Sequence, residues 1–350
     1  MIKSLNLSVA LVTHNNGVDA VSALDSILTS TADFLGVQFV VVDNASGDDT
    51  PHVLKRWLSA NACDYEFIQS TENNIGRARK IAVDSAKHDL IYFTDPDCKV
   101  RRNTISLLVD SLLRQRQIDD RSAAVGGANY FVESSRLAMH LNALRSTTLG
   151  HFNSAQMLAS IECRPIDHVS TCNAVYWRPI LNANNFSEEF LRVGEDLQVS
   201  YKLIAKKYLL FFNGSAIVDH ASPEGYLDWL KKSFGYGKAQ MKVASRNLAI
   251  YHSHRLIPFY LVTLSLFSLF VSKFLFSCLT IAFVTFGLAT TFQLRIRGSR
   301  GLNFVDALFV VFGTSLAYGV GEVFGAAKVT APGISRLTLG HLSRQLFSRA

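Results

Sequence analysis

Two aspartates separated by one proline, Asp95 and Asp97, are the residues of this sequence best placed by type and spacing to do chemistry. They follow a short apolar run over residues 90–93 that is typical of a buried strand. Two carboxylates one residue apart can converge on Mg²⁺ or Mn²⁺, which bind few carboxylates and complete their coordination with water and phosphate oxygens. Because aspartate is common in turns of every kind, this D-x-D pattern needs support from other groups.

Polar side chains also stand at the ends of two earlier apolar runs: Thr13, His14 and Asn15 after residues 7–12, and Asp43 after residues 37–42. The carboxyl ends of parallel strands meet at one edge of a sheet, where ligands bind, so these groups are expected to face one cleft with Asp95. A carboxylate such as Asp43 can accept a hydrogen bond from a nucleotide base. His14 alone is more typical of a surface or stacking residue. Asp48 or Asp49 is expected to cap the next helix.

A second polar group begins a predicted helix over residues 76–86. Asn74, Gly76, Arg77 and Arg79 combine an amide, a glycine turn and two guanidinium groups at a helix N-terminus, which suits an anion. An ordinary helix cap with solvated arginines explains the same residues equally well.

A later helix, predicted over residues 194–203, opens with the acidic pair Glu195 and Asp196. Acidic residues in a first turn are favoured by the helix dipole whatever their function. The functional alternative is a general base that takes a proton from an attacking hydroxyl. His220 follows a predicted strand over residues 209–218 and can either complete a metal site with Asp97 or cap its own turn.

The elements that must position these groups alternate between strands and helices. Strands are predicted at 7–12, 37–42, 65–69, 90–93, 123–128, 171–177 and 209–218, and helices at 18–35, 49–58, 76–86 and 194–203. This alternation predicts an α/β fold whose sheet is parallel in its first half and covered by helices on both faces. A length of 350 residues suits one large domain with an appendage.

The C-terminal part is strongly apolar. Residues 256–271 and 274–292 are each about long enough to span a bilayer and predict a helical hairpin, while residues 304–327 either span or lie in the interface. Arg295, Arg297 and Arg300 favour the cytoplasm for the loop that follows the hairpin and hence for the N-terminal domain. The predicted organisation is a catalytic domain at 1–225, a lid at 226–253, membrane-associated helices at 254–330 and a basic tail at 331–350.

Composition supports a membrane-associated protein. Hydrophobic residues make up 49% and charged residues 18% of the chain, and the net charge is +7. Basic residues cluster near the apolar segments, so the predicted partner is anionic membrane lipid and not nucleic acid. Five cysteines without a C-x-x-C pair predict neither a disulfide framework nor a zinc site, and no secretory leader is expected at the N-terminus.

Together these motifs resemble family 2 of the inverting glycosyltransferases, which have a GT-A fold, a Rossmann-like mixed sheet. The resemblance rests on five segments in the family's order: Ser8–Asn15, Val41–Ser46, Asn74–Arg79, Asp95–Asp97 and Gly194–Asp196. It extends over about residues 5–220. The segment over residues 231–240 and the apolar hairpin resemble membrane-bound members that build bacterial polysaccharides, the succinoglycan-type transferases among them.

The resemblance implies a role for each matching position. A nucleotide-sugar donor would contact the first two strand ends, the helix motif and the lid: Thr13, His14, Asn15, Asp43, Asn74, Arg79, Asp95, Trp229 and Lys238. Divalent metal, Mg²⁺ or Mn²⁺, would lie at Asp97, with Asp95 and His220 as further candidates. Asp196 would be the catalytic base and Glu195 its support.

The expected activity is metal-dependent transfer of one sugar, with inversion, from a UDP-sugar to a hydroxyl of a lipid-linked or polysaccharide-precursor acceptor at the cytoplasmic face of the inner membrane. Val12 stands where the family usually has proline, and Lys80 where it often has asparagine. The Q-x-x-R-W pattern of processive synthases is missing near Trp229, which favours single transfer. The alternatives are a polyprenyl-phosphate sugar synthase, whose acceptor needs no strong base, and an inactive nucleotide-binding scaffold.

Overall fold

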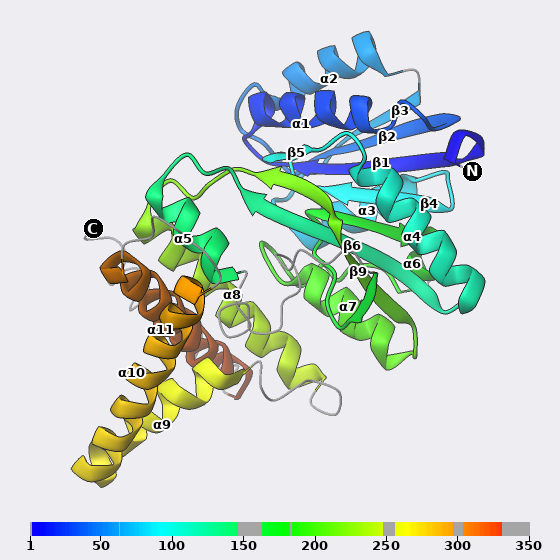
Figure 1. Cartoon of the computed structure of the whole chain (residues 1–350). Helices are drawn as coiled ribbons and strands as arrows, with labels where there is room; N and C mark the ends of the chain where they lie inside the picture. The colour runs from blue at the N-terminus through cyan, green and yellow to red at the C-terminus, as the bar shows by residue number, and fades with distance from the viewer. Residues whose placement is uncertain are drawn as a thin grey trace. The chain divides into compact units, whose positions relative to one another are not determined.

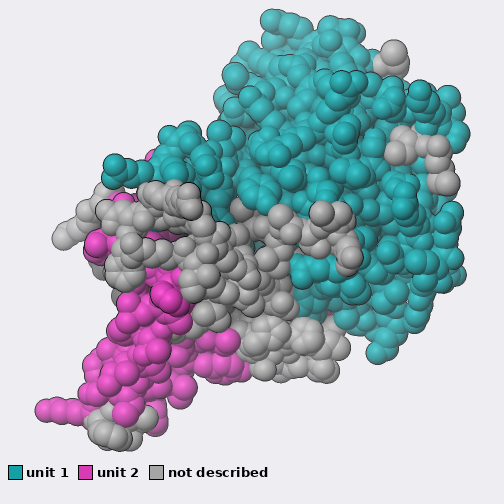
Figure 2. Space-filling model, in the orientation of Figure 1, with its two compact units in different colours: residues 1–223, 294–302 teal, residues 224–293, 303–350 magenta. Residues whose placement is uncertain are grey.

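The computed structural model describes residues 2–62, 64–145, 163–182, 184–247, 256–296 and 304–330. The chain forms two compact units, coloured separately in Figure 2. The first comprises Met1–Pro223 and Leu294–Leu302, and the second comprises Glu224–Gln293 and Asn303–Ala350.

A mixed sheet organises the first unit (Figure 1). Four parallel strands form one half, in the order β3 (Asp64–Gln69), β2 (Gly36–Asp43), β1 (Asn6–Thr13) and β4 (Leu90–Thr94). The sheet continues through β8 (Asn173–Trp177), β6 (Ser122–Phe131), β9 (Leu209–His220) and β5 (Cys98–Val100), while β7 (Arg164–Ile166) pairs with β9. In this second half only the β6–β9 pair is parallel.

Helices cover both faces of the sheet because its strands are apolar on both sides. Along β1, Leu7, Val9 and Leu11 face a core shared with α1 (Gly17–Ser30), α2 (Thr50–Asn61) and α4 (Thr104–Ile118). The intervening Ala10 and Val12 face a second core, shared with α3 (Ile75–Ser85), α6 (Arg178–Asn182) and α7 (Glu195–Ala205). This two-residue alternation is the geometry of an extended chain. The remaining elements of this unit are η1 (Ile2–Ser4) and α5 (Arg136–Arg145).

The predicted fold class is confirmed, and the parallel half lies where the sequence pattern placed it. The helix predicted over residues 18–35 ends at Ser30. The pattern missed β5 and α4, and β6 runs to Phe131, three residues beyond the predicted end at Ala128. Asp49 occupies the N-cap position of α2, but Asp48 is the residue whose carboxylate accepts the Thr50 N–H.

The second unit contains α8 (Tyr226–Arg246), α9 (Ile257–Val271), α10 (Lys273–Ile296) and α11 (Phe304–Thr330) in the described part of the chain. Helices α8 and α11 pack at very close range: a Cβ on Gly237 would overlap the backbone of Tyr318, and one on Gly321 would overlap the backbone of Phe234. Small residues at such contacts are typical of helix pairs in membranes.

Helix α11 is long and apolar enough, over Val305–Ala327, to cross a membrane, and it is the one such helix among the described residues. Helix α9 has 15 residues, fewer than the roughly 20 that span a bilayer core. Glu322, in the C-terminal third of α11, is fully buried and accepts a hydrogen bond from Gln240 Nε2 at 3.0 Å. Arg297, Arg300 and the basic tail of the sequence prediction lie outside the described residues.

Candidate active site

The first two strand ends form a buried polar corner. Thr13 and Asp43 are partners in the β1–β2 register, and the Asn44 N–H donates to the Thr13 carbonyl at 2.7 Å. Thr13 Oγ1 and Asp43 Oδ1 are buried side-chain atoms that have no hydrogen-bond partner among the described residues. Since buried polar atoms are almost always hydrogen-bonded, this corner is suited to a ligand that supplies the missing partners.

The loops after β1 and β2 are tied together around His14. Its Nδ1 lies 2.9 Å from the Asn44 carbonyl oxygen, and its Nε2 lies 2.9 Å from Asn73 Nδ2. Asn15 and Ala45 have φ angles of 51° and 61°, in the left-handed region that non-glycine residues rarely occupy. Such strain persists where surrounding contacts impose it, often at ligand sites. The imidazole is thus held in place at the exposed rim of the corner.

Asn74 caps helix α3. Its side-chain oxygen accepts the Arg77 N–H at 3.1 Å, and its Nδ2 donates to the Glu188 carbonyl at 2.6 Å. Arg77 pairs with Glu72 at 3.1 Å, and both side chains are exposed. Of the two interpretations left open by the sequence, these contacts are those of an ordinary helix cap.

Arg79 differs from Arg77 because it is buried between two carboxylates. Its Nη2 lies 2.5 Å from Asp95 Oδ1, its Nε lies 3.1 Å from Glu195 Oε1, and its side chain is 3% exposed. Burial opposes the charge, but the two carboxylates raise the pKa of Arg79 above its usual value. Arg79 therefore joins the Asp95–Asp97 turn to the first turn of α7.

The two acidic residues that begin α7, Glu195 and Asp196, have pKa values shifted in opposite directions. Burial and the neighbouring Asp196 raise the pKa of Glu195 to about 8. Burial also opposes the charge on Asp196, but His168, the Leu197 N–H and Arg79 together lower the pKa of Asp196 below its usual value. Two carboxyl groups whose pKa values are pushed apart can take different roles, and Asp196 is the one whose ionised form these contacts favour.

His168 and Tyr176 are neighbours of Asp196 that the sequence did not reveal. His168 Nε2 lies 3.3 Å from Asp196 Oδ2. The Tyr176 hydroxyl, on β8, is buried and has no hydrogen-bond partner in the described part of the chain. Neither residue belongs to a motif with recognisable spacing, so only the folded chain brings them to the site.

Replacing His168 with asparagine is expected to move the acid limb of the pH–rate profile to higher pH. The groups facing Asp196 are His168, Arg79, Glu195 and Tyr176, and removing the imidazole removes an interaction that lowers the pKa of Asp196. Asp196 would then become protonated at a higher pH, while the rate at alkaline pH changes little. Measurement of kcat/KM from acid to alkaline pH tests this.

The matched control for that profile is His88→Asn, because His88 follows α3, near the amino end of β4 and away from the carboxyl edge. An acid limb that stays at its wild-type position in His168→Asn would show that the imidazole does not tune Asp196.

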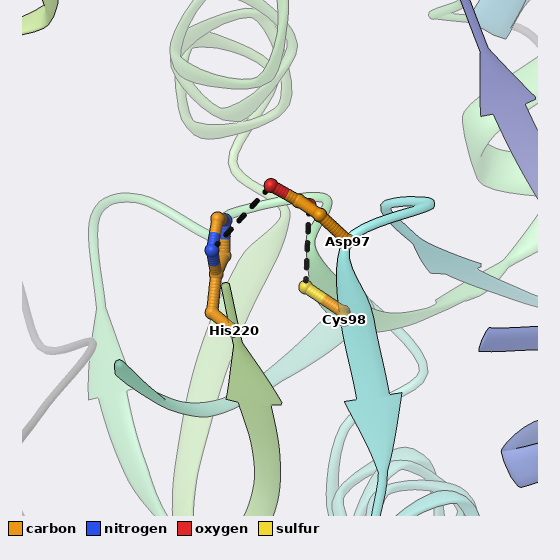
Figure 3. Close-up of side chains that lie close together, drawn as sticks. All are labelled: Asp97, Cys98 and His220. Carbon is orange, nitrogen blue, oxygen red and sulfur yellow. Dashed lines mark hydrogen bonds and ion pairs between the residues drawn. The ribbon is translucent and has the colours of Figure 1, made fainter. Parts of the chain in front are cut away.

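Asp97, in the turn just before β5, lies beside His220 at the end of β9 (Figure 3). Asp97 Oδ2 is 3.6 Å from His220 Nδ1, and Asp97 Oδ1 is 4.0 Å from the thiol of Cys98. One ligand atom from each of the three residues lies within 4.8 Å of the others. Carboxylate, imidazole and thiol are all metal-binding groups, so the residues present fit a divalent cation. Asp95 is instead engaged by Arg79.

Two residues of the predicted lid, Trp229 and Lys238, belong to the second unit. The Trp229 indole is buried and donates to Thr314 Oγ1 of α11 at 2.8 Å, while the Lys238 ammonium lies 5.4 Å from the centroid of the Phe234 ring. These contacts describe packing within that unit, and the lid role stays a prediction.

The mixed sheet, with acidic groups at the carboxyl edge of its parallel half, is that of a GT-A glycosyltransferase. The chain belongs to glycosyl transferase family 2, whose profile matches residues 8–183. The matched span contains Thr13, Asp43, Arg79 and the Asp95–Asp97 turn, and it ends before α7.

Comparisons with individual proteins agree with this assignment. The chain is 22% identical over 208 residues to the minor teichoic acid biosynthesis protein GgaB of Bacillus subtilis (strain 168), covering 59% of this chain. It spans about a fifth of that relative, 22% of its length. The fold is similar to that of the mannosyltransferase PcManGT from Pyrobaculum calidifontis in complex with GDP-Man and Mn²⁺, with a TM-score of 0.56, 16% identity and coverage of 94% and 88%. It is also similar to GalNAc-T7 with UDP, GalNAc and Mn²⁺, with a TM-score of 0.50, 15% identity and coverage of 75% and 51%.

Proposed function

We propose that this protein is a metal-dependent, inverting glycosyltransferase that moves one sugar from a UDP-sugar to a hydroxyl of a lipid-linked glycan or polysaccharide precursor. The observation that carries the proposal is the contact chain through Arg79, which connects the Asp95–Asp97 turn to Glu195 and hence to Asp196. The turn proposed to bind the metal and the helix turn that carries the proposed base are thus connected through one buried arginine. The Mn²⁺ and nucleotides named with the two structural neighbours support a donor of this chemistry.

The donor would bind at the buried polar corner formed by Thr13 and Asp43 and at its exposed rim. Asp43 Oδ1 and Thr13 Oγ1 would meet the hydrogen-bonding groups of the base and ribose, since both atoms are buried and lack partners among the described residues. His14, exposed at the rim, offers a flat surface for the base, and Asn15 shapes the loop beneath it. Asp97 and His220 would hold the divalent cation. When bound, such a cation offsets the charge that develops on a leaving diphosphate.

The chemistry proposed for the chain's own residues is a single displacement. Asp196 accepts the proton of the acceptor hydroxyl, which lets that oxygen attack the anomeric carbon from the face opposite the diphosphate. His168 positions the Asp196 carboxylate, and Arg79 fixes the helix turn on which it lies. Glu195 keeps Arg79 in place and takes no proton from the acceptor.

An acceptor at the membrane is supported by the second unit. Large apolar side chains are exposed on three of its helices: Tyr260, Leu264, Phe267, Ile281, Val284, Leu288, Phe292, Val305, Phe309 and Leu316. Surfaces of this kind are usually covered by lipid or by another protein. Together with a helix able to span and a curated relative named for teichoic acid biosynthesis, they favour an acceptor carried on lipid at the inner membrane, with the catalytic unit in the cytoplasm.

Asp97→Ala is expected to abolish the metal-dependent part of donor binding. In the wild type, UDP-sugars should raise the melting temperature more with Mn²⁺ than with a chelator, because a ligand of the native state stabilises it. Without the Asp97 carboxylate the two conditions should give equal shifts. A thermal-shift screen of UDP- and GDP-sugars, read with and without Mn²⁺, measures this.

Asp110→Ala is the control for that screen, because Asp110 is an acidic residue on α4 that pairs only with the exposed Arg114 of the same helix in the contacts described. Full metal dependence in Asp97→Ala would contradict the metal assignment. Transfer that proceeds at the wild-type rate in a chelator would contradict the proposed function as a whole.

A further inference from the structure

The thiol of Cys98 lies beside the two groups proposed to hold the metal (Figure 3). Cys98 is directly opposite His220 on the antiparallel strands β5 and β9. Side chains of directly opposed residues leave the same face of a sheet, with Cβ atoms roughly 4.5–5.5 Å apart. Asp97 lies in the turn just before β5, and its carboxylate reaches the same point as the thiol and the imidazole.

The three ligand types are those of a zinc site. Zinc binds cysteine, histidine and aspartate together, and sites with three protein ligands keep one position open. Mg²⁺ prefers oxygen ligands alone, and a thiolate shifts selectivity towards softer cations. In the general order of affinities Mn²⁺ also lies well below Zn²⁺ for any nitrogen, oxygen and sulfur set.

The spacing of the ligand atoms points the same way. Zinc bonds of about 2.0–2.3 Å at tetrahedral angles separate ligand atoms by roughly 3.4–3.6 Å. Octahedral Mg²⁺, with bonds of about 2.0–2.1 Å, separates neighbouring oxygens by only about 2.9 Å. Here Asp97 Oδ1 lies 4.0 Å from Cys98 Sγ, and one ligand atom from each of the three residues lies within 4.8 Å of the others. Small side-chain movements would therefore complete a tetrahedral set.

The surroundings of the ligands are also those of a metal site. His220 Nδ1 lies 2.9 Å from the Ala221 carbonyl oxygen, and its ring packs edge-on against Phe131. When Nδ1–H donates to that carbonyl, Nε2 is left to bind a cation, and the ring orientation is fixed. The other buried sulfur nearby, Cys172, accepts hydrogen bonds from Asn129 at 2.9 Å and Ser170 at 3.3 Å and is not one of the three converging ligands.

We propose that Asp97, Cys98 and His220 form a zinc-binding site in which Cys98 is a ligand. On binding, Zn²⁺ replaces the thiol proton of Cys98, which passes to solvent, and no electron is transferred. The inference deepens the proposed function and rests on it in one respect: zinc held here would exclude the Mn²⁺ or Mg²⁺ that the transfer needs. The sequence argued against zinc only because its cysteines lack close spacing, and the ligands come from two strands far apart in the chain.

Cobalt absorption of the full-length protein in detergent, without donor or acceptor, tests the proposal. Co²⁺ bound to a thiolate gives a sulfur-to-metal charge-transfer band in the near ultraviolet, which we expect in the wild type and expect one equivalent of Zn²⁺ to remove. Cys98→Ser should lack the band and bind Zn²⁺ at least about 100-fold more weakly, since even partners of metal ligands change affinity by 10–100-fold. Its Mn²⁺ affinity, measured by electron paramagnetic resonance, should change by no more than a few-fold.

Cys163→Ser and Cys172→Ser are the matched controls, and both should keep the band. Three results would overturn the proposal: no sulfur band in the wild type, a band that persists in Cys98→Ser, or an equal loss in Cys172→Ser. If Cys98→Ser does not fold, the wild-type spectrum and loss of zinc binding in His220→Ala decide the question. This experiment measures metal binding alone, so its failure would overturn the zinc site and leave the proposed sugar transfer to be judged by the donor-binding and turnover measurements.

Discussion

Replacing Asp196 with asparagine is expected to lower kcat by about 10²–10⁴-fold, the usual contribution of a general base, while donor binding stays close to wild type. Asparagine matches aspartate in size and can still accept the Leu197 N–H that Asp196 Oδ1 accepts at 2.7 Å. It cannot take a proton from the acceptor. The loss should appear in kcat, with donor affinity measured separately by thermal shift.

Asp120→Asn is the control for this substitution, because it removes the same charge from an exposed position at the end of α4. Turnover that is unchanged in Asp196→Asn would exclude the base assignment. A different result would identify the polyprenyl-phosphate sugar synthase. In that case the wild type would not transfer sugar to hydroxyl acceptors, and Asp196→Asn would still transfer sugar to a polyprenyl phosphate, because a phosphate acceptor is already ionised.

The first half of the fold was predictable because each of its strands is marked by residues that are neighbours in the sequence. Buried parallel strands are continuous apolar runs that end in polar residues, and β1, β2 and β4 end within a residue or two of the predicted positions, at Thr13, Asp43 and Thr94. Helix α4 was also within reach, since Ile105, Leu108 and Leu112 have helical spacing and are buried. Strand β5 was not, because a segment of three residues carries no periodicity.

The candidate site was predictable as a list of residues but not as a set of contacts. Asp95 and Arg79 were both named from motifs, yet nothing in their spacing shows that the guanidinium is turned inward to the carboxylates and not outward to a donor. Cys98 and His168 were missed altogether. Each acquires its role from a contact across the fold, with His220 and Asp196 respectively, and a single sequence does not encode such pairings in a local pattern.

The second large effect is expected on stability: Arg79→Met should destabilise the protein by about 3–5 kcal/mol, because it leaves the buried Glu195 and the Asp95 carboxylate without their shared cation. Methionine fills a similar volume, so the loss comes from the charge and its hydrogen bonds. For a unit of this size the melting temperature should fall by roughly 6–20 °C. Arg79→Lys should restore little, since an ammonium cannot bridge two carboxylates as the guanidinium fork does.

Arg77→Met is the control for Arg79→Met, two residues away on the same helix. Its partner Glu72 is exposed, and surface pairs of this kind contribute about 0–1 kcal/mol. Equal melting temperatures for the two variants would show that Arg79 does not hold the site together. If instead the double variant Arg79→Met/Glu195→Gln has a higher melting temperature than Arg79→Met, the stability lost in Arg79→Met comes from the uncompensated Glu195 carboxylate. The same arginine would then stabilise the catalytic unit and keep the base at the edge where the metal ligands lie.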